Sequence, residues 1–194
     1  MKRLSVLLMF MILAFACVTT PTLKDYPAKG SDEKGIIQLL LNLENALNSY
    51  DPKGVLRAYA SDAKVWTSDY DARWSLRMFT KDELETHIAK IAPRIEKAML
   101  KYKYLKPRNI YIQGNQACMM VPYEIVSTSP DSNYREKGIH YFELVKINQD
   151  WFISKSIWET TDCNYSNWQE LQRSNRNNKN IYEIVDCFSP KCRE

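Results

Sequence analysis

Two histidines and a few nearby carboxylates are the side chains best suited to acid–base chemistry in this sequence. His140 stands in a strand-like stretch beside Tyr141 and Glu143. Histidine titrates near neutrality, so His140 paired with Glu143 would suit a general base. The alternative is a hydrogen-bonded structural histidine. His87 is adjacent to Ile88 in a helical pattern, and we expect it to flank a buried stripe.

The sequence lacks the spacings that are typical of metal sites. It contains neither His-x-x-x-His nor Cys-x-x-Cys, and Cys187 and Cys192 have no matching partners at a metal-ligand spacing. We therefore expect no metal and no cofactor.

Aromatic residues supply a second kind of candidate site. Aromatic side chains combine a large apolar area with a few polar groups, which suits a pocket for an apolar or ring-bearing ligand. The alternative is that they fill the core, since an aromatic content of 12% needs no ligand to explain it. The candidate pocket residues are Tyr59, Trp66, Trp74, Tyr123, His140, Phe142 and Trp158.

The N-terminus predicts export. Lys2 and Arg3 precede an apolar run over residues 4–13, and Ala14-Phe15-Ala16 places small residues before Cys17. The apolar run is shorter than the ~20 residues that a membrane-spanning helix needs. Residues 1–16 are therefore predicted to be a cleaved signal peptide.

Cys17 is the predicted site of a lipid anchor. A small residue directly before a cysteine resembles the lipobox of bacterial lipoproteins. The five cysteines are an odd number for an exported protein, and lipidation of Cys17 leaves an even four. Because Val18 is not aspartate, the lipoprotein resemblance implies the periplasmic side of the outer membrane in a cell with two membranes. The alternative is a secreted protein with a free Cys17.

The charge balance argues against a nucleic-acid partner. Removing Lys2 and Arg3 with the signal lowers the Lys and Arg count from 27 to 25, against 23 acidic residues, so the mature chain is nearly neutral. One basic cluster is expected to be a solvated helix end rather than a phosphate-binding face. It consists of Lys97, Lys101, Lys103 and Lys106.

Helical periodicity dominates the first half of the chain after a flexible tether predicted over residues 17–34. Helices are predicted from Ser31 or Asp32, from Asp51-Pro52 and from the capping box at Thr80, with a kink or a break near residue 92 caused by Pro93. A short strand is predicted over 63–67.

From residue 105 onward the period changes to two. Strands are predicted over 108–113, 116–127, 134–147 and 151–159, joined by short turns. The predicted class is α+β, with N-terminal helices packed on a mostly antiparallel sheet.

The tail over residues 160–194 carries three cysteines. We expect Cys163 to pair with Cys187 or Cys192 in an oxidising compartment, and Cys118 to be either a partner or a buried free thiol. The alternative is that all four cysteines are reduced.

The runs ENALNSYDPKGVLRAYASDAKVW, FTKDELETHI and KGIHYFELVKINQDWFISKSIW resemble the nuclear transport factor 2-like superfamily, which includes ketosteroid isomerase and SnoaL-like cyclases. The resemblance covers residues 35–159. It implies a cone-like domain with a curved sheet around a pocket, and frequent homodimers. Leu43 and Thr67 occupy the positions of the isomerase tyrosine and base, so that mechanism does not carry over. Asp69 and Glu143 are the nearest carboxylates.

Three functions follow from this resemblance. The favoured one is a non-catalytic module at the bacterial envelope that binds a small apolar ligand or a protein partner. The second is a SnoaL-like isomerase, cyclase or dehydratase in which His140 acts with Glu143 or Asp69 on a ring substrate. The third is a structural protein that forms a homodimer through its sheet.

Overall fold

Among the residues that the structure describes, the helical periodicity of the sequence produces three α-helices. The computed structural model describes residues 20–69, 75–130 and 132–163. A short 3-10 turn, η1 (Leu23–Asp25), precedes α2 (Ser31–Asn48) and α3 (Pro52–Arg57), and α4 (Lys81–Lys97) follows two strands later. Ile36, Leu40 and Leu43 are almost completely buried on one face of α2, so this helix packs its predicted apolar stripe against the sheet.

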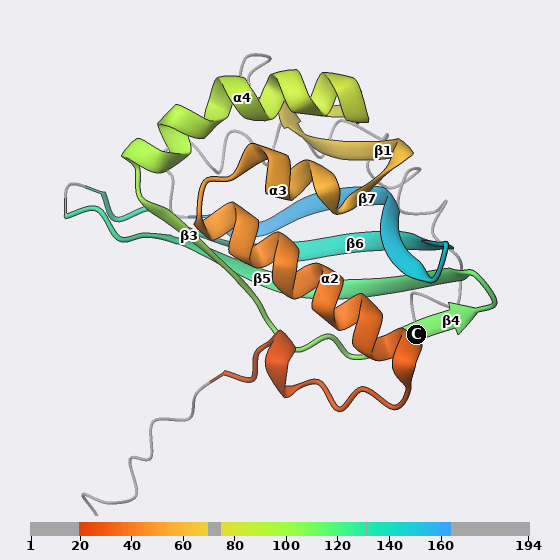
Figure 1. Cartoon of the computed structure of the whole chain (residues 1–194). Coiled ribbons are helices and arrows are strands. Elements are labelled where there is room, and N and C mark those ends of the chain that lie inside the picture. Colours follow the sequence, from red (N-terminus) through yellow and green to blue (C-terminus); the bar gives the residue numbers. More distant parts are fainter. Residues whose placement is uncertain (1–19, 70–74, 131, 164–194) are drawn as a thin grey trace, which may run out of the picture.

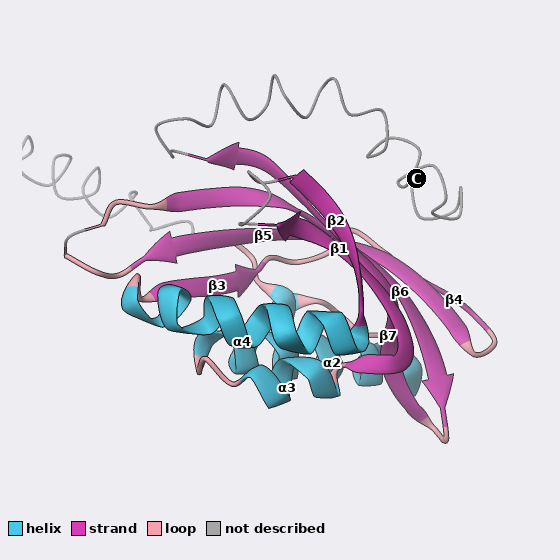
Figure 2. Ribbon diagram, turned by 90° about the horizontal axis from the view of Figure 1, so that it is seen from above, coloured by secondary structure: helices cyan, strands magenta, loops and turns pink. Residues whose placement is uncertain are grey.

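The strands form one curved, seven-stranded sheet with the helices on one face (Figures 1 and 2). The strand order is β2-β1-β7-β6-β5-β3, β4 also pairs with β5, and only β1 and β7 run parallel. This arrangement confirms the predicted α+β class. The strands are β1 (Tyr59–Asp69), β2 (Ser75–Thr80), β3 (Leu100–Tyr104), β4 (Ile110–Gln113), β5 (Gln116–Ser127), β6 (Arg135–Ile147) and β7 (Asp150–Cys163).

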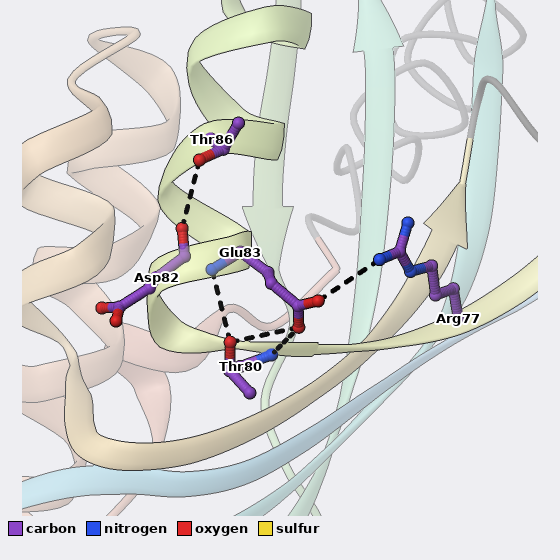
Figure 3. A network of polar contacts seen from close by, with 5 residues as sticks. All are labelled: Arg77, Thr80, Asp82, Glu83 and Thr86. Atoms are coloured by element: carbon purple, nitrogen blue, oxygen red, sulfur yellow. Dashed lines mark hydrogen bonds and ion pairs between the residues drawn. The ribbon is translucent and has the colours of Figure 1, made fainter.

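The capping box at Thr80 starts α4 as predicted (Figure 3). The Thr80 hydroxyl accepts from the Glu83 amide, and the Glu83 carboxylate accepts from the Thr80 amide at 2.9 Å. Of the kink or break expected near residue 92, the break is wrong, because α4 continues through Pro93 to Lys97. Proline removes one intrahelical hydrogen bond, and the helix continues for only about one further turn.

Of the lysine cluster, Lys97 lies at a helix end, as the last residue of α4, but Lys101 and Lys103 do not. Lys101 and Lys103 lie in β3, an edge strand in which Tyr102 and Tyr104 alternate with them. The ammonium of Lys101 donates to the carbonyl of Asn48 at 2.9 Å. Lysine and tyrosine alternate in β3, which is the period of a strand, and the prediction of a helix end overlooked this alternation.

The segment predicted as a tether is partly docked on the domain. Leu23 is completely buried in the main core, and Thr22 forms a β-bridge with Leu105. The amide of Lys106 also donates to the carbonyl of Pro21 at 3.1 Å. The tether prediction is therefore wrong for residues 21–25, where a buried leucine, η1 and the contacts with residues 105–106 hold the chain, and for residues 31–34, which form the first turn of α2.

Among the described residues, no helix is both long and apolar enough to cross a membrane.

Candidate functional site

The helix-facing side of the sheet carries a cluster of large aromatic side chains, which we call the inner aromatic cluster. Tyr104 and Tyr123 are each 2% exposed, and Phe142 is completely buried. These side chains lie close to His140 and Trp158 because residues two apart on a strand share a face and paired residues face each other. The cluster consists of Tyr102, Tyr104, Tyr123, His140, Phe142 and Trp158.

His140 is hydrogen-bonded inside this cluster. Its Nδ1 lies 2.9 Å from the Tyr104 hydroxyl, and its ring centroid lies 3.9 Å from Phe142 and 4.4 Å from Trp158. Only 1% of the residue is exposed. The aromatic packing and the hydrogen bond hold His140 as a neutral structural group.

Burial sets the proton affinities in this cluster. Desolvation lowers the pKa of His140 well below its usual value and raises the pKa of Tyr104 well above its usual value, with Tyr59 and Glu44 adding to the rise at Tyr104. Desolvation also raises the pKa of Tyr59 to about 12. The imidazole and both phenols therefore stay neutral at physiological pH.

A buried carboxylate forms a second polar network near the inner cluster. Glu136 is 7% exposed and accepts hydrogen bonds from the hydroxyls of Tyr123 at 2.6 Å, Thr160 at 2.8 Å and Tyr134. Desolvation and the Glu136 charge raise the pKa of Tyr123. This phenol therefore remains a hydrogen-bond donor.

Trp158 lies between His140 and Tyr123, which donates to Glu136. Its ring centroid lies 4.4 Å from His140 and 4.8 Å from Tyr123, and it meets Tyr102 edge to face at 5.9 Å. These spacings are those of packed aromatic pairs. The space between the two networks is filled by an indole ring.

The structure brings together five of the seven predicted pocket residues on the helix-facing side: Tyr59, Tyr123, His140, Phe142 and Trp158. Trp66 is not among them, because it packs on the opposite face of the sheet beside Ile157. Alternation along β1 explains the error, since Val65 points into the main core and Trp66 points away from it. Trp74 lies outside the described residues.

The predicted pair of His140 and Glu143 is wrong. The two residues are three apart in β6 and point to opposite faces, and Glu143 instead accepts from the Lys155 ammonium at 3.3 Å on the outer face. Asp69 ends β1, and its side chain lies outside the described part of the molecule.

Tyr104, Glu136 and Thr160 were missed as candidate site residues. Tyr104 lies in a strand that was predicted to be helical, and Glu136 is separated in sequence from each of its main partners, Tyr123 and Thr160. An alternation count over 100–104 would have placed Tyr104 on the inner face. The hydroxyls around Glu136 depend on strand pairing, which no local pattern gives.

Cys118 is buried on the outer face and is disulfide-bonded, which corrects the alternative of a free thiol. The predicted pairing of Cys163 involves Cys187 and Cys192, which lie outside the described residues.

Within residues 20–69, 75–130 and 132–163, no group of three His, Cys, Asp or Glu side chains is placed to hold a metal ion.

No protein-family profile and no curated protein sequence matches this chain. Solved structures share its fold. An NTF2-like protein of unknown function from Pseudomonas putida KT2440 is 15% identical, with a TM-score of 0.58 over 66% of this chain and 86% of that one.

Two other neighbours differ in role. A candidate calcium/calmodulin-dependent protein kinase II association domain from Xanthomonas campestris is 15% identical, with a TM-score of 0.56 over 70% of this chain and 91% of that one. A candidate scytalone dehydratase from Novosphingobium aromaticivorans is 11% identical, with a TM-score of 0.52 over 68% and 85% of the two chains. These identities establish the fold alone, which different functions share.

Proposed function

We propose that this chain, which has the NTF2-like fold, is an exported and lipid-anchored module that binds a ligand or a protein partner without catalysing a reaction. The observation that carries the proposal is the environment of His140. His140 is buried, hydrogen-bonded to the Tyr104 hydroxyl and separated from Glu143, which pairs with Lys155, and this environment favours a non-catalytic role.

A general base must reach the proton that it removes, within about 2.6–3.2 Å or through one water. His140 is 1% exposed, its Nδ1 lies against the Tyr104 hydroxyl, and burial lowers its pKa. The predicted carboxylate partner, Glu143, lies on the other face of the sheet. His140 therefore has neither the access nor the partner that catalysis would need.

The anchor part of the proposal depends on Cys17 and the signal-like sequence before it. Thr22, which contacts Leu105, lies five residue steps after Cys17. At ~3.3 Å per residue they span at most about 17 Å. A lipid on Cys17 would hold the domain close to the membrane, on the periplasmic side of the outer membrane in a cell with two membranes; secretion is the alternative.

The anchor is tested by expressing the full chain in a bacterium and measuring the mass of its mature N-terminus. We expect a diacylated, N-acylated Cys17 in the membrane fraction, and a Cys17→Ser variant without this mass increase. Val18→Asp is the matched control, because it keeps the cysteine and changes only the predicted sorting residue. An unmodified Cys17 in the wild-type protein would overturn the anchor.

One observation favours an enzyme as the second candidate. Glu136 is a buried carboxylate that accepts a hydrogen bond from the Tyr123 phenol at 2.6 Å, and a carboxylate beside a phenol can move protons on a ring substrate. A SnoaL-like isomerase, cyclase or dehydratase would use this pair rather than His140. One structural neighbour, the candidate scytalone dehydratase, makes such an activity worth measuring.

The binding and enzyme proposals give different results in one assay. We would incubate the purified protein with 2-tetralone in deuterated buffer and follow exchange of the α-protons by NMR. We expect exchange at the buffer rate for the wild type and for Glu136→Gln. Acceleration that is lost in Glu136→Gln but kept in Glu143→Gln would favour the enzyme, and native mass spectrometry of the same sample would detect a retained ligand.

A further inference from the structure

The face of the sheet that points away from the helices carries an apolar cluster of its own. Met120, Tyr141, Ile157 and Trp66 are direct neighbours in a row across β5, β6, β7 and β1. Cys118 belongs to the same cluster. We call it the outer-face cluster, and it consists of Cys118, Tyr141 and Ile157, with Trp66, Tyr111, Met120 and Ile139 packed against them.

This cluster is more deeply buried than a bare sheet face allows. Ile157 is completely buried, and Tyr141 and Cys118 are each 9% exposed. Side chains on one sheet face are shielded from above only by a second layer about 10 Å away. The helices α2, α3 and α4 all lie on the other face (Figure 2). Among the described elements, none supplies that second layer.

The register of the strands restricts the disulfide partner of Cys118. Cys118 pairs with Glu143 on β6, whereas Cys163 pairs with Glu136. Seven residues along a strand span about 23 Å at ~3.3 Å per residue. A disulfide needs Cα atoms within about 7 Å, so Cys163 cannot be the partner.

The remaining candidate partners of Cys118 are Cys17, Cys187 and Cys192. Near the start of the described chain, Thr22 forms a bridge with Leu105 and Leu23 is buried in the main core, which lies on the helix side of the sheet. The chain after Cys163 holds 31 residues, including Cys187 and Cys192. It also holds apolar residues that could cover a surface, among them Trp168, Leu171, Ile181, Ile184, Val185 and Phe188.

We propose that the C-terminal segment, residues 164–194, packs on the outer-face cluster, and that Cys187 or Cys192 is the disulfide partner of Cys118. The 24 residues from Cys163 to Cys187 span about 36 Å even as a continuous helix, which exceeds the ~25 Å to Cys118. Forming the bond removes two protons and two electrons from two thiols, and a disulfide-exchanging oxidant of the export compartment accepts them.

The proposal has a consequence for assembly. A sheet face covered by the chain's own tail is not available to a second copy, so the face that would support a homodimer is already occupied. Cys163 then takes whichever of Cys187 and Cys192 is left, and all four cysteines after Cys17 are paired.

Disulfide mapping tests the assignment on the full chain. The protein would be alkylated with iodoacetamide without reduction, digested with trypsin and analysed by mass spectrometry. Lys191 separates Cys187 from Cys192, so the two linkages give different peptides. We expect the peptide containing Cys118 to be linked to one of these two. A link to Cys17, a link between two copies of Cys118, or an alkylated Cys118 would overturn the proposal.

A Cys118→Ser variant provides an independent measurement. We expect one newly alkylated thiol, at Cys187 or Cys192, and none at Cys163. Light scattering should give a monomer for the wild type, and a dimer would overturn the occupied face. If the variant does not fold, the wild-type linkage map and mass still decide the question.

Discussion

The hydrogen bond between Tyr104 and His140 shows how burial changes the role of an acid–base residue. The sequence places His140 beside a carboxylate, yet the folded chain places its Nδ1 2.9 Å from a phenol whose pKa is raised by burial. Two neutral groups that share one hydrogen bond in an apolar layer stabilise the fold because neither needs to carry a charge.

Removing the Tyr104 hydroxyl should reduce stability. Tyr104→Phe leaves His140 Nδ1 buried without its partner, and an unsatisfied buried polar group costs about 1–3 kcal/mol. Denaturant unfolding would measure the loss. Tyr111→Phe is the matched control, since its half-buried hydroxyl accepts only from the Asn109 amide group at 3.3 Å, and we expect a change within about 0.5 kcal/mol. Equal losses in both variants would contradict this account.

The buried neutral state of His140 predicts a dependence of stability on pH. Its folded pKa lies well below the ~6.5 of the unfolded chain. Below pH ~6.5 the unfolded state binds one more proton, so the free energy of unfolding falls by up to ~1.4 kcal/mol per pH unit as the pH is lowered toward the folded pKa.

His140→Gln should remove this contribution, and the comparison is unfolding of both proteins by denaturant between pH 7 and 5. His87→Gln is the control, because it retains His140 and its part of the slope. The same pH slope in wild type and His140→Gln would show that His140 is charged in the folded protein.

At the scale of elements, alternation along β6 decides which side chains can act together. Glu136, His140 and Phe142 face inward, whereas Glu143 faces outward and binds Lys155. Gly138 lies between Glu136 and His140 on the same side, and its lack of a side chain leaves room for the Tyr123 ring and hydroxyl. The Glu136 network therefore depends on a glycine inside a strand, although glycine usually weakens a strand.

Gly138→Ala should be strongly destabilising. The added Cβ would overlap the carbonyl oxygen of Glu159 and lie 2.5 Å from the Tyr123 hydroxyl. Overpacking of this kind costs about 1–3 kcal/mol, and we expect the upper part of that range because backbone must move. Gly30→Ala is the control, since its Cβ meets nothing within 4 Å. Thermal unfolding would give the melting temperatures of both variants. A wild-type melting temperature for Gly138→Ala would rule out the close contact.

At the scale of the whole molecule, the sheet separates two apolar layers. The helices cover one face, and the outer-face cluster occupies the other. The chain also enters the domain earlier than its composition indicates, because Leu23 inserts into the main core ahead of α2. Residues 21–25 are thus part of the folded unit rather than of a flexible tether.

Leu23→Ala should release this segment. Truncating a completely buried leucine costs about 2–5 kcal/mol when the site cannot collapse, and less where the segment detaches locally. We expect faster trypsin cleavage after Lys24 and Lys29, which mass spectrometry of the digest would measure. Gln38→Ala, an exposed change on α2, is the control. Unchanged cleavage in Leu23→Ala would show that the bridge between Thr22 and Leu105 holds the segment by itself.

The local patterns predicted most of the elements and little of the candidate site. The α2 stripe, the Asp51-Pro52 start of α3 and the Thr80 cap follow from interactions within a few residues, so the sequence alone specifies them. The early start of β1 depends on pairing with β7 and the strand β3 on pairing with β5, both distant in sequence, whereas β2 pairs with its neighbour β1; these strands were missed or shortened.

Local patterns in the sequence specify the class of the fold, the order of its helices and late strands, and most of the aromatic residues that fill its interior. Tertiary packing specifies which side chains meet: Tyr104 with His140, Tyr123 with Glu136, and Glu143 with Lys155 rather than His140. The reason is physical. Periodicity fixes the faces of an element, but strand register and order fix its neighbours, and these follow from packing across the whole molecule.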